Sequence, residues 1–351
     1  MKIEIIENIE DFPQFEARNV FQIMEWMRLF EGEDDTKVVL FAVYANAQCT
    51  MHNAQLDAIG DMDKSQLLLL QPVVIQRFVK WLPCRLGSYA VAWREPWRAE
   101  YISNEDAQQL FEVLQKAINQ YCRRKALYIE YRHFAQDNIY HSLLLRHCKV
   151  LPWYNIYNQI SASEDVEQGL NKSKRKQLRQ SFKAGVRVEL NPNDDEIREW
   201  YVLLKKLYKR IHRPLPSVNV FLRLNKSGIG RVFVVIYKGR VISGSAILCL
   251  LSKEKNSQFY RQRLKDLRFS TLNSQLFYDW YRASTNEQIE GIYPSVVSTW
   301  QAMQWIADMG GGRFDFMGAG RQNKEYGVRQ FKLKFGGKLI PEYRYRKCLM
   351  K

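Results

Sequence analysis

Residues 314–337, FDFMGAGRQNKEYGVRQFKLKFGG, concentrate the residue types that could bind an anion. Five glycines, five basic residues and five aromatics share these 24 positions. Glycine is favoured where the backbone takes a positive φ or where a ligand approaches the main chain. Cations and aromatic rings placed between glycines suit an anionic, partly planar ligand. The alternative interpretation is a turn between two strands whose charges are solvated.

Common catalytic motifs are absent from this stretch and from the rest of the chain. After Gly318 and Gly320, Asn323 occupies the third glycine position of a dinucleotide-binding fingerprint, and the Walker A spacing is missing. The sequence contains no HExxH or GxSxG motif, and its five histidines show no metal-ligand spacing. We therefore expect neither a metal site nor a nucleotide bound through a dinucleotide-binding fingerprint or a Walker A loop.

The glycine-rich stretch divides into a strand (313–317), a loop and a short helix (328–335). On that helix Arg329 and Lys332 would share one face, with aromatic residues on another. Such a cationic face could hold phosphate or a developing oxyanion. Asp315 alternates with two phenylalanines on the strand, so it would either accept a proton or anchor the glycine loop through backbone N–H groups.

Charge is distributed unevenly along the chain, whose net charge is +16. Residues 1–150 contain 17 basic and 20 acidic residues, whereas residues 151–351 contain 36 and 17. No acidic residue lies between Glu199 and Glu254. This asymmetry favours an anionic partner for the second half, such as phosphate, nucleic acid or an anionic membrane surface.

Length and composition predict a globular protein of two domains. The chain has 351 residues, 46% of them hydrophobic and 26% charged. No apolar run is long enough to cross a membrane, and the acidic start lacks the features of a signal peptide. The six cysteines form no CxxC pair, which fits a reducing cytoplasm.

The first half reads as a mixed α/β unit. Its clearest element is a helix from Ser103 to about Arg124, which Ser103 can cap and in which Asp106 completes a capping box. An apolar-periodic stretch is expected at 21–30, and strands at 2–6, 37–45, 66–75 and 126–132. A polar seam at 158–165 suggests a boundary that separates domains 1–160 and 161–351.

The second half reads as an α/β domain with a central mixed sheet. A helix at 165–184 ends at Gly185, a second is capped by Asp194, and a hairpin turns at Lys238–Gly239. An aromatic strand (275–284) and an apolar helix from Pro294 follow. The first of these helices carries a basic stripe that is either a solvated face or a binding surface: Lys172, Arg175, Lys176, Arg179 and Lys183.

Three segments of the second half together resemble the FemA/FemB-type acyltransferases. They are FDFMGAG…YGVRQFKLKFGG, PSVVSTWQAMQWIADMGG and LNKSKRKQLRQSFKAGVRVEL. That family is a branch of the GNAT superfamily and includes the peptidoglycan interpeptide-bridge enzymes. The resemblance is strongest over 160–351 and fainter in the first half. It implies an α/β fold with mixed sheets and two tandem GNAT-like acyltransferase domains, in which an acyl donor and an amine acceptor meet in a cleft.

The resemblance also implies roles for particular residues. Lys332, which forms an FK pair with Phe331, would stabilise negative charge on the donor or on the tetrahedral intermediate, and Arg329 would contact phosphate. Arg210 and Arg213 resemble the arginine region of the family that faces the donor.

Further candidates come from the residues around these positions. Tyr281 has the parity of Asp279 on the aromatic strand, so both could point into the cleft beside Arg282, although core packing is equally compatible with the pattern. The remaining candidates are Glu325 and Tyr326 as bases, and Gly318 and Gly320 at the donor.

The donor is left open by two departures from the family. The insertion at 253–275 is short for the helical arm found in bridge-forming enzymes, and the glycine-rich pyrophosphate loop of GNAT enzymes is missing. We expect aminoacyl-tRNA or acyl-CoA as co-substrate, and an amine acceptor such as a pyrophosphate-linked cell-wall precursor. The expected location is the cytoplasm or the inner face of the membrane. The alternatives are acyl-CoA-dependent N-acylation of a small molecule, and a non-catalytic protein that binds RNA or an anionic surface.

Overall fold

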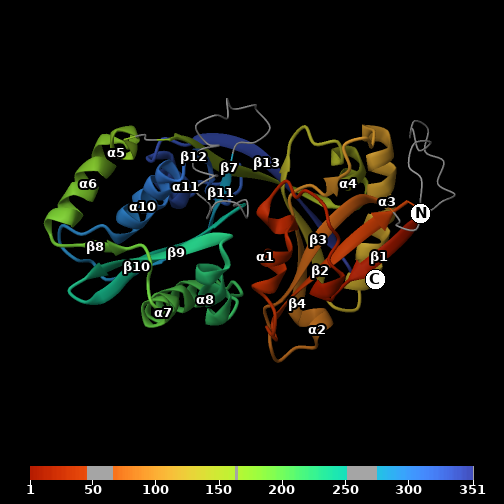
Figure 1. Ribbon diagram of the computed structural model, residues 1–351, viewed down its shortest axis with the longest axis horizontal. Coiled ribbons are helices and arrows are strands. Elements are labelled where there is room, and N and C mark those ends of the chain that lie inside the picture. The colour runs from red at the N-terminus through yellow and green to blue at the C-terminus, as the bar shows by residue number, and fades with distance from the viewer. Residues whose placement is uncertain (46–65, 163–164, 251–274, 351) are drawn as a thin grey trace. The chain divides into compact units, whose positions relative to one another are not determined.

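The computed structural model describes residues 1–45, 66–162, 165–250 and 275–350, which form two compact units (Figure 1). The first unit comprises Met1–Pro152 and Pro341–Lys351, and the second comprises Trp153–Ile340. The boundary expected at residue 160 differs from this division, because residue 160 falls inside strand β7 (Lys149–Ser161). Of the insertion at 253–275, all but Gln275 lies outside the described residues.

The first unit contains a sheet in the order β1-β2-β3-β4-β6-β13. The strands are β1 (Lys2–Ile6), β2 (Thr36–Tyr44), β3 (Leu67–Arg77), β4 (Ser88–Trp93), β6 (Tyr128–Ala135) and β13 (Lys338–Cys348), with β5 (Trp97–Arg98) beside β3. β13 brings the end of the chain into this unit, since Glu342–Cys348 pairs antiparallel with β6. β4 and β6 run parallel and are joined through helix α3 (Asn104–Cys122), which packs on the sheet.

Short helices complete the first unit: η1 (Ile9–Asp11), η2 (Val20–Gln22), α1 (Met24–Arg28), α2 (Cys84–Gly87) and α4 (His141–His147). The predicted start of α3 is confirmed, because the Ser103 hydroxyl accepts the Asp106 N–H at 3.0 Å. Leu110, Phe111 and Leu114 of α3 are buried against the sheet, as the apolar periodicity predicts.

The second unit contains a sheet in the order β7-β12-β11-β10-β9-β8. Its other strands are β8 (Arg187–Glu189), β9 (Gly230–Tyr237), β10 (Arg240–Cys249), β11 (Leu276–Ser284) and β12 (Gly311–Asp315). The predicted hairpin is confirmed: Lys238 and Gly239 both have positive φ, and Tyr237 pairs with Arg240. β11 and β12 are parallel, whereas their outer neighbours are antiparallel to them.

Helices cover both faces of the second sheet (Figure 1). They are α5 (Val166–Gly169), α6 (Lys172–Lys183), α7 (Asp194–Arg210), α8 (Val218–Ser227), α10 (Pro294–Asp308) and α11 (Gly327–Leu333). α7 and α8 pack on one face, where a Cβ at Gly244 would lie only 2.7 Å from the Trp200 ring. α10 packs on the other face and is itself covered by α5 and α6.

Two local predictions in the second unit were wrong. The single helix expected at 165–184 is interrupted at Leu170, whose backbone is extended and whose side chain is buried; Asn171 then caps α6 through the Ser173 N–H. The cap of α7 is Asn193 rather than Asp194, because Asn193 and Glu196 form a reciprocal capping box. In both cases an asparagine side chain satisfies N–H groups that the helix leaves unpaired.

No helix in the described part of the chain combines the length and the hydropathy that a membrane crossing requires.

Candidate functional site

The parallel strands β11 and β12 separate after only three paired positions. Leu276 pairs with Arg313 and Tyr278 with Asp315. Beyond this point β11 continues to Ser284, whereas the chain after Asp315, among the described strands, stays hydrogen-bonded only to β7, through the Ile156 and Tyr154 carbonyls. Open α/β sheets bind ligands outside the carboxyl ends of parallel strands, where neighbouring chains diverge. The candidate site therefore lies between the end of β11 and residues 316–321, which we call the glycine loop.

The glycine loop has an unusual backbone that is held by many hydrogen bonds. Met317, Gly318 and Gly320 all have positive φ, at 58°, 104° and 85°. For Met317 this conformation is uncommon and costs free energy. The Gly318 N–H donates to Asn155 Oδ1 at 2.7 Å, and the Ala319 N–H donates to the Tyr154 carbonyl at 2.7 Å. A strained backbone with this many partners is a rigid one.

Asp315 anchors the start of the loop. Its side chain is fully buried, and Oδ1 accepts the Met317 N–H at 2.7 Å and the Asn155 amide at 2.9 Å. Of the two roles expected for Asp315, anchoring is the one that these contacts describe. Its role as a proton acceptor stays a prediction.

Lys332 and Arg329 of α11 bind the carbonyl groups of the glycine loop. Lys332 Nζ donates to the Phe316 carbonyl at 2.6 Å and to the Gly318 carbonyl at 2.8 Å. Arg329 Nε donates to the Ala319 carbonyl at 2.9 Å, and its Nη2 donates to the Arg321 carbonyl. Hydrogen bonds from ionised donors are stronger than neutral ones, so the two cations fix the shape of the loop.

These contacts change how the two cations are understood. We expected the guanidinium group of Arg329 to bind phosphate. It instead donates hydrogen bonds to backbone carbonyls and lies over the Tyr154 ring. Lys332 is partly buried beside the Phe316 ring. Both residues position the loop, and the catalytic role of Lys332 stays a prediction.

The remaining candidates of the C-terminal stretch differ in exposure. Tyr326 is 44% exposed, and a Cβ added to Gly320 would lie 2.7 Å from its ring. Glu325 is exposed, and Phe331 packs on the buried Phe335 with ring centroids 5.0 Å apart. Gly320 is thus required both by its φ and by its closeness to Tyr326.

A β-bulge at Trp280 sets the directions of the β11 side chains. On β10, Ala246 pairs with Tyr281 but the next residue, Ile247, pairs with Asp279. Tyr281 therefore turns to the α7 and α8 face, where it contacts Tyr208 and Phe221. The expectation that Tyr281 shares a face with Asp279 was wrong, because strict alternation ignores the extra residue.

Arg282, by contrast, lies on the α10 face with Asp279. Its Nη2 is 3.0 Å from Asp279 Oδ1, and its Nη1 donates to Thr299 of α10. Hydroxyl groups extend this cluster along α10 and the two neighbouring strands: Ser243, Ser284, Ser295 and Ser298. The Ser245 hydroxyl, opposite Arg282 in the β10–β11 register, is buried without a hydrogen-bond partner in the described structure.

The hydroxyl cluster and Asn155 were not predicted from the sequence. Serine at alternate positions 243 and 245 of an otherwise apolar strand was an available signal, since apolar side chains normally fill such positions. Asn155 gave no local signal, because it lies 163 positions before Gly318.

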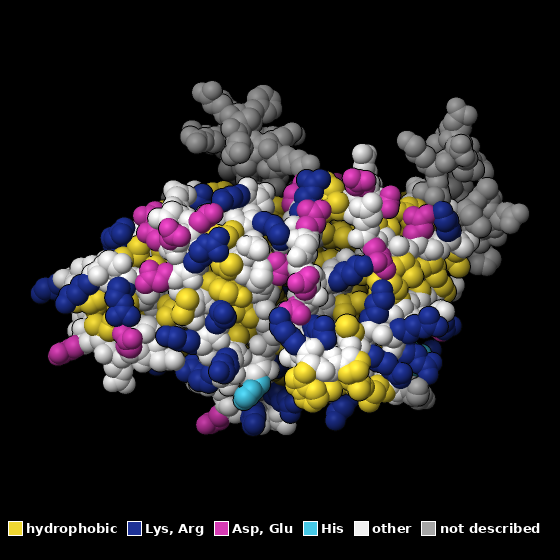
Figure 2. All heavy atoms as spheres, turned by 90° about the horizontal axis from the view of Figure 1, so that it is seen from below, with side chains coloured by type: hydrophobic (Ala, Val, Ile, Leu, Met, Phe, Trp, Pro, Cys, Tyr) yellow, Lys and Arg dark blue, Asp and Glu magenta, His cyan; other side chains and the backbone are white. Residues whose placement is uncertain are grey.

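Arg210 and Arg213 lie at the end of α7. Arg210 is exposed and donates to Asn286 just beyond β11, at 2.9 Å. Arg213 is exposed, without a side-chain partner in the described residues. Figure 2 views the α7 and α8 side, where basic side chains stand among acidic and apolar ones. The described residues contain no group of three or more His, Cys, Asp or Glu side chains that could hold a metal ion.

Comparison with protein-family models and with curated proteins finds no match. Among solved structures, FemX matches 99% of this chain and 97% of its own, with a TM-score of 0.59 and 14% identity. A tandem GNAT protein from the clavulanic acid biosynthesis pathway matches 100% of this chain and 99% of its own, with a TM-score of 0.54 and 7% identity. These likenesses confirm the predicted tandem GNAT-like fold and, at the level of fold, the resemblance to the FemA/FemB type.

Proposed function

We propose that this chain, which has the tandem GNAT-type fold of FemX, transfers an activated acyl group to an amine at the carboxyl ends of β11 and β12. The observation that carries the proposal is the glycine loop. Its strained backbone is fixed from one side by Asn155 and Asp315 and from the other by Lys332 and Arg329. Rigid polar groups around a reacting carbonyl are what acyl transfer requires.

In the proposed reaction the lone pair of the amine attacks the carbonyl carbon of an ester or thioester. A carbon–nitrogen bond forms, the carbonyl oxygen becomes a tetrahedral oxyanion, and the bond from carbon to the donor oxygen or sulfur then breaks. The amine nitrogen loses a proton, and the departing oxygen or sulfur gains one. The developing oxyanion is the charge that the site has to stabilise.

Lys332 has two parts in this proposal. Its hydrogen bonds to the Phe316 and Gly318 carbonyls hold the loop, and they also fix its positive charge beside Gly318. A fixed charge stabilises an oxyanion more than a mobile one, because no reorganisation is needed during the reaction. Glu325 and Tyr326 are exposed, so the proposal uses no dedicated protein base and the amine enters deprotonated.

The acceptor that we propose is an amine of a cell-wall precursor. The support is the FemA/FemB-type resemblance of the sequence and the similarity in fold to FemX. A pyrophosphate-linked precursor would also match the excess of basic residues in 151–351. Reaction with such a precursor would place the protein in the cytoplasm, at the inner face of the membrane.

A second candidate function is N-acylation of a small amine by acyl-CoA. It is favoured by the similarity in fold to the tandem GNAT protein from the clavulanic acid biosynthesis pathway, because AcCoA is the acyl-CoA named for that protein, whose matched structure is the one without it. The purified protein should be incubated with an amine acceptor and either a charged tRNA or acetyl-CoA, and the amide product measured by mass spectrometry. Amide formed from one donor identifies that donor. If neither donor gives an amide and the protein still binds RNA, the non-catalytic alternative replaces the proposal.

A further inference from the structure

We propose that the outer face of α6 binds the phosphodiester backbone of RNA, and that this RNA is the tRNA body of an aminoacyl donor. The identification of the RNA as a donor rests on the proposed function. The binding surface itself rests on the geometry and charge of α6.

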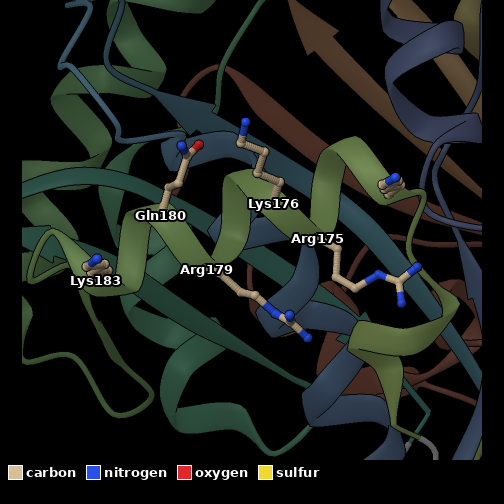
Figure 3. Close-up of a pocket in the computed structure, with 6 residues that line it drawn as sticks. Arg175, Lys176, Arg179, Gln180 and Lys183 are labelled. Carbon is tan, nitrogen blue, oxygen red and sulfur yellow. The ribbon is translucent and has the colours of Figure 1, made fainter.

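The basic residues of α6 line one shallow hollow of about 500 Å³. Figure 3 shows Lys176 and Gln180 extending to one side of the helix, and Arg175 and Arg179 to the other. From Lys172 to Lys183 the stripe covers about 16 Å of helix axis. This length exceeds a single phosphate group and matches several successive phosphates of a nucleic-acid strand. A row of cations of this length predicts a polymeric anion.

The charges of this stripe are poorly compensated. Arg179 pairs with Glu167, but Lys172, Lys176 and Lys183 have no ion-pair partner among the described residues. The first turn of α6 contains no acidic residue, whereas that of α7 contains three. The positive end of a helix dipole normally attracts carboxylates, so cations at this end are unfavourable until an anion binds.

Lys174 adds a partly desolvated charge beneath the stripe. It is only 9% exposed; its ammonium donates to Gln177 and lies 4.7 Å from the centre of the Phe331 ring. Burial, and then repulsion from Lys334, lowers the pKa of Lys174. Burial is the larger cause, and the smaller one, repulsion from Lys334, shows that a second cation lies near Lys174.

The start of α10 is poorly suited to a diphosphate such as that of CoA. A helix start binds phosphate through free N–H groups. Here the first residue of the helix is Pro294, which has no N–H, and the preceding Tyr293 N–H donates to the Ser181 hydroxyl of α6 at 2.9 Å. α6 therefore occupies this position and presents its own cations outward. This arrangement favours RNA over CoA as the anionic part of the donor.

The same helix is poorly suited to a membrane surface. Interfacial helices place an apolar face in the lipid. In α6, Leu178 is buried in the core, and Phe182, at 37% exposure, packs edge-on against Trp300 of α10. Because Leu178 is buried and Phe182 packs on Trp300, α6 has no continuous apolar face to place in lipid.

The test compares two charge-matched variants of the full chain. One carries Lys172→Ala, Lys176→Ala and Lys183→Ala on α6; the control carries Lys205→Ala, Lys206→Ala and Lys209→Ala on α7, all exposed residues. Binding of an uncharged tRNA transcript is measured across a salt series, and thermal melting checks that each variant folds. We expect the α6 variant to weaken binding about tenfold or more at low salt and to reduce the salt slope by about 2 to 3. The control should change binding less than about threefold.

Three results would overturn the inference: equal weakening by both variants, no tRNA binding by the wild type, or α6-dependent binding to phosphatidylglycerol vesicles without binding to tRNA. The outcomes for the two proposals are separable. Binding of tRNA through α6 without acyl transfer from any donor removes the proposed function alone. Acyl transfer from acetyl-CoA without α6-dependent tRNA binding removes this inference alone.

Discussion

Asp279 and Arg282 lie three positions apart on β11, yet they form an ion pair on one face of the sheet, with Arg282 Nη2 3.0 Å from Asp279 Oδ1. Side chains three apart on a regular strand point to opposite faces. The extra residue at Trp280 turns the Arg282 side chain to the same face of the sheet as Asp279. On that face Arg282 also donates to Thr299 of α10. The end of β11 and the start of α10 are thereby held together at the candidate site.

Removing Arg282 should be costly, because Asp279 is 8% exposed and would be left as an uncompensated charge. We expect Arg282→Ala to lower the free energy of unfolding by about 3 kcal/mol or more. Arg210→Ala, which removes an exposed arginine, should change it by less than about 0.5 kcal/mol. Urea denaturation of both variants measures the difference, and equal values would show that the ion pair is not structural.

Gly320→Ala should disturb the glycine loop more than its φ alone predicts. A matched control exists in Gly185, which has a similar φ of 91° but no atom within 4 Å of an added Cβ. We expect Gly185→Ala to cost about 1 kcal/mol through backbone strain, and Gly320→Ala to cost about 1 to 3 kcal/mol more through overlap with Tyr326. Thermal melting compares the two. Rescue of Gly320→Ala by Tyr326→Ala is expected, and absence of rescue would contradict the steric explanation.

Stability of the first unit should depend on the ionisation of Glu130. Burial raises its pKa, but Arg132, Arg344 and Arg346 together outweigh burial and bring the pKa to about 2. Because the folded pKa lies below the ordinary 4.5, this stabilisation is present above pH 4.5 and is lost as the pH falls towards 2.

Replacement of Glu130 with Gln tests this dependence. The variant should be less stable than the wild type by roughly 3 kcal/mol at neutral pH, and the difference should shrink below about pH 4. Denaturation at a series of pH values checks it. A difference that does not vary with pH would mean that packing, rather than charge, explains the effect.

The fold could be predicted largely from local patterns. Ser103 and Asp106 indicate the start of α3, and Pro294 indicates the start of α10. Lys238–Gly239 indicates the hairpin. These features are predictable because caps and turns depend on neighbouring residues. The break at Leu170 was not predictable from apolar periodicity, which continues through it. The return of β13 to the first unit depends on pairing with residues about 200 positions earlier.

The glycine loop could be expected from the sequence, but its contacts could not. Gly318 and Gly320 indicated the loop, since glycine is favoured where φ is positive. The hydrogen-bond partners of Arg329 and Lys332 could not be predicted from the sequence, because a cation next to a glycine loop can face either a ligand or the carbonyl groups of the loop. Asn155, Ser298 and Thr299 come from other elements, so only the assembled fold shows that they contact Asp315 and Arg282.

If the fixed glycine loop and the charge of Lys332 promote acyl transfer, their effect is measured as kcat with the donor that gives an amide. Lys332→Ala should lower kcat about a hundredfold with KM changed less than about threefold, because an interaction of the transition state is lost. Lys334→Ala, two residues away and exposed, should keep kcat within about twofold. A folded Lys332→Ala protein with wild-type kcat would show that the charge of Lys332 takes no part in the transfer.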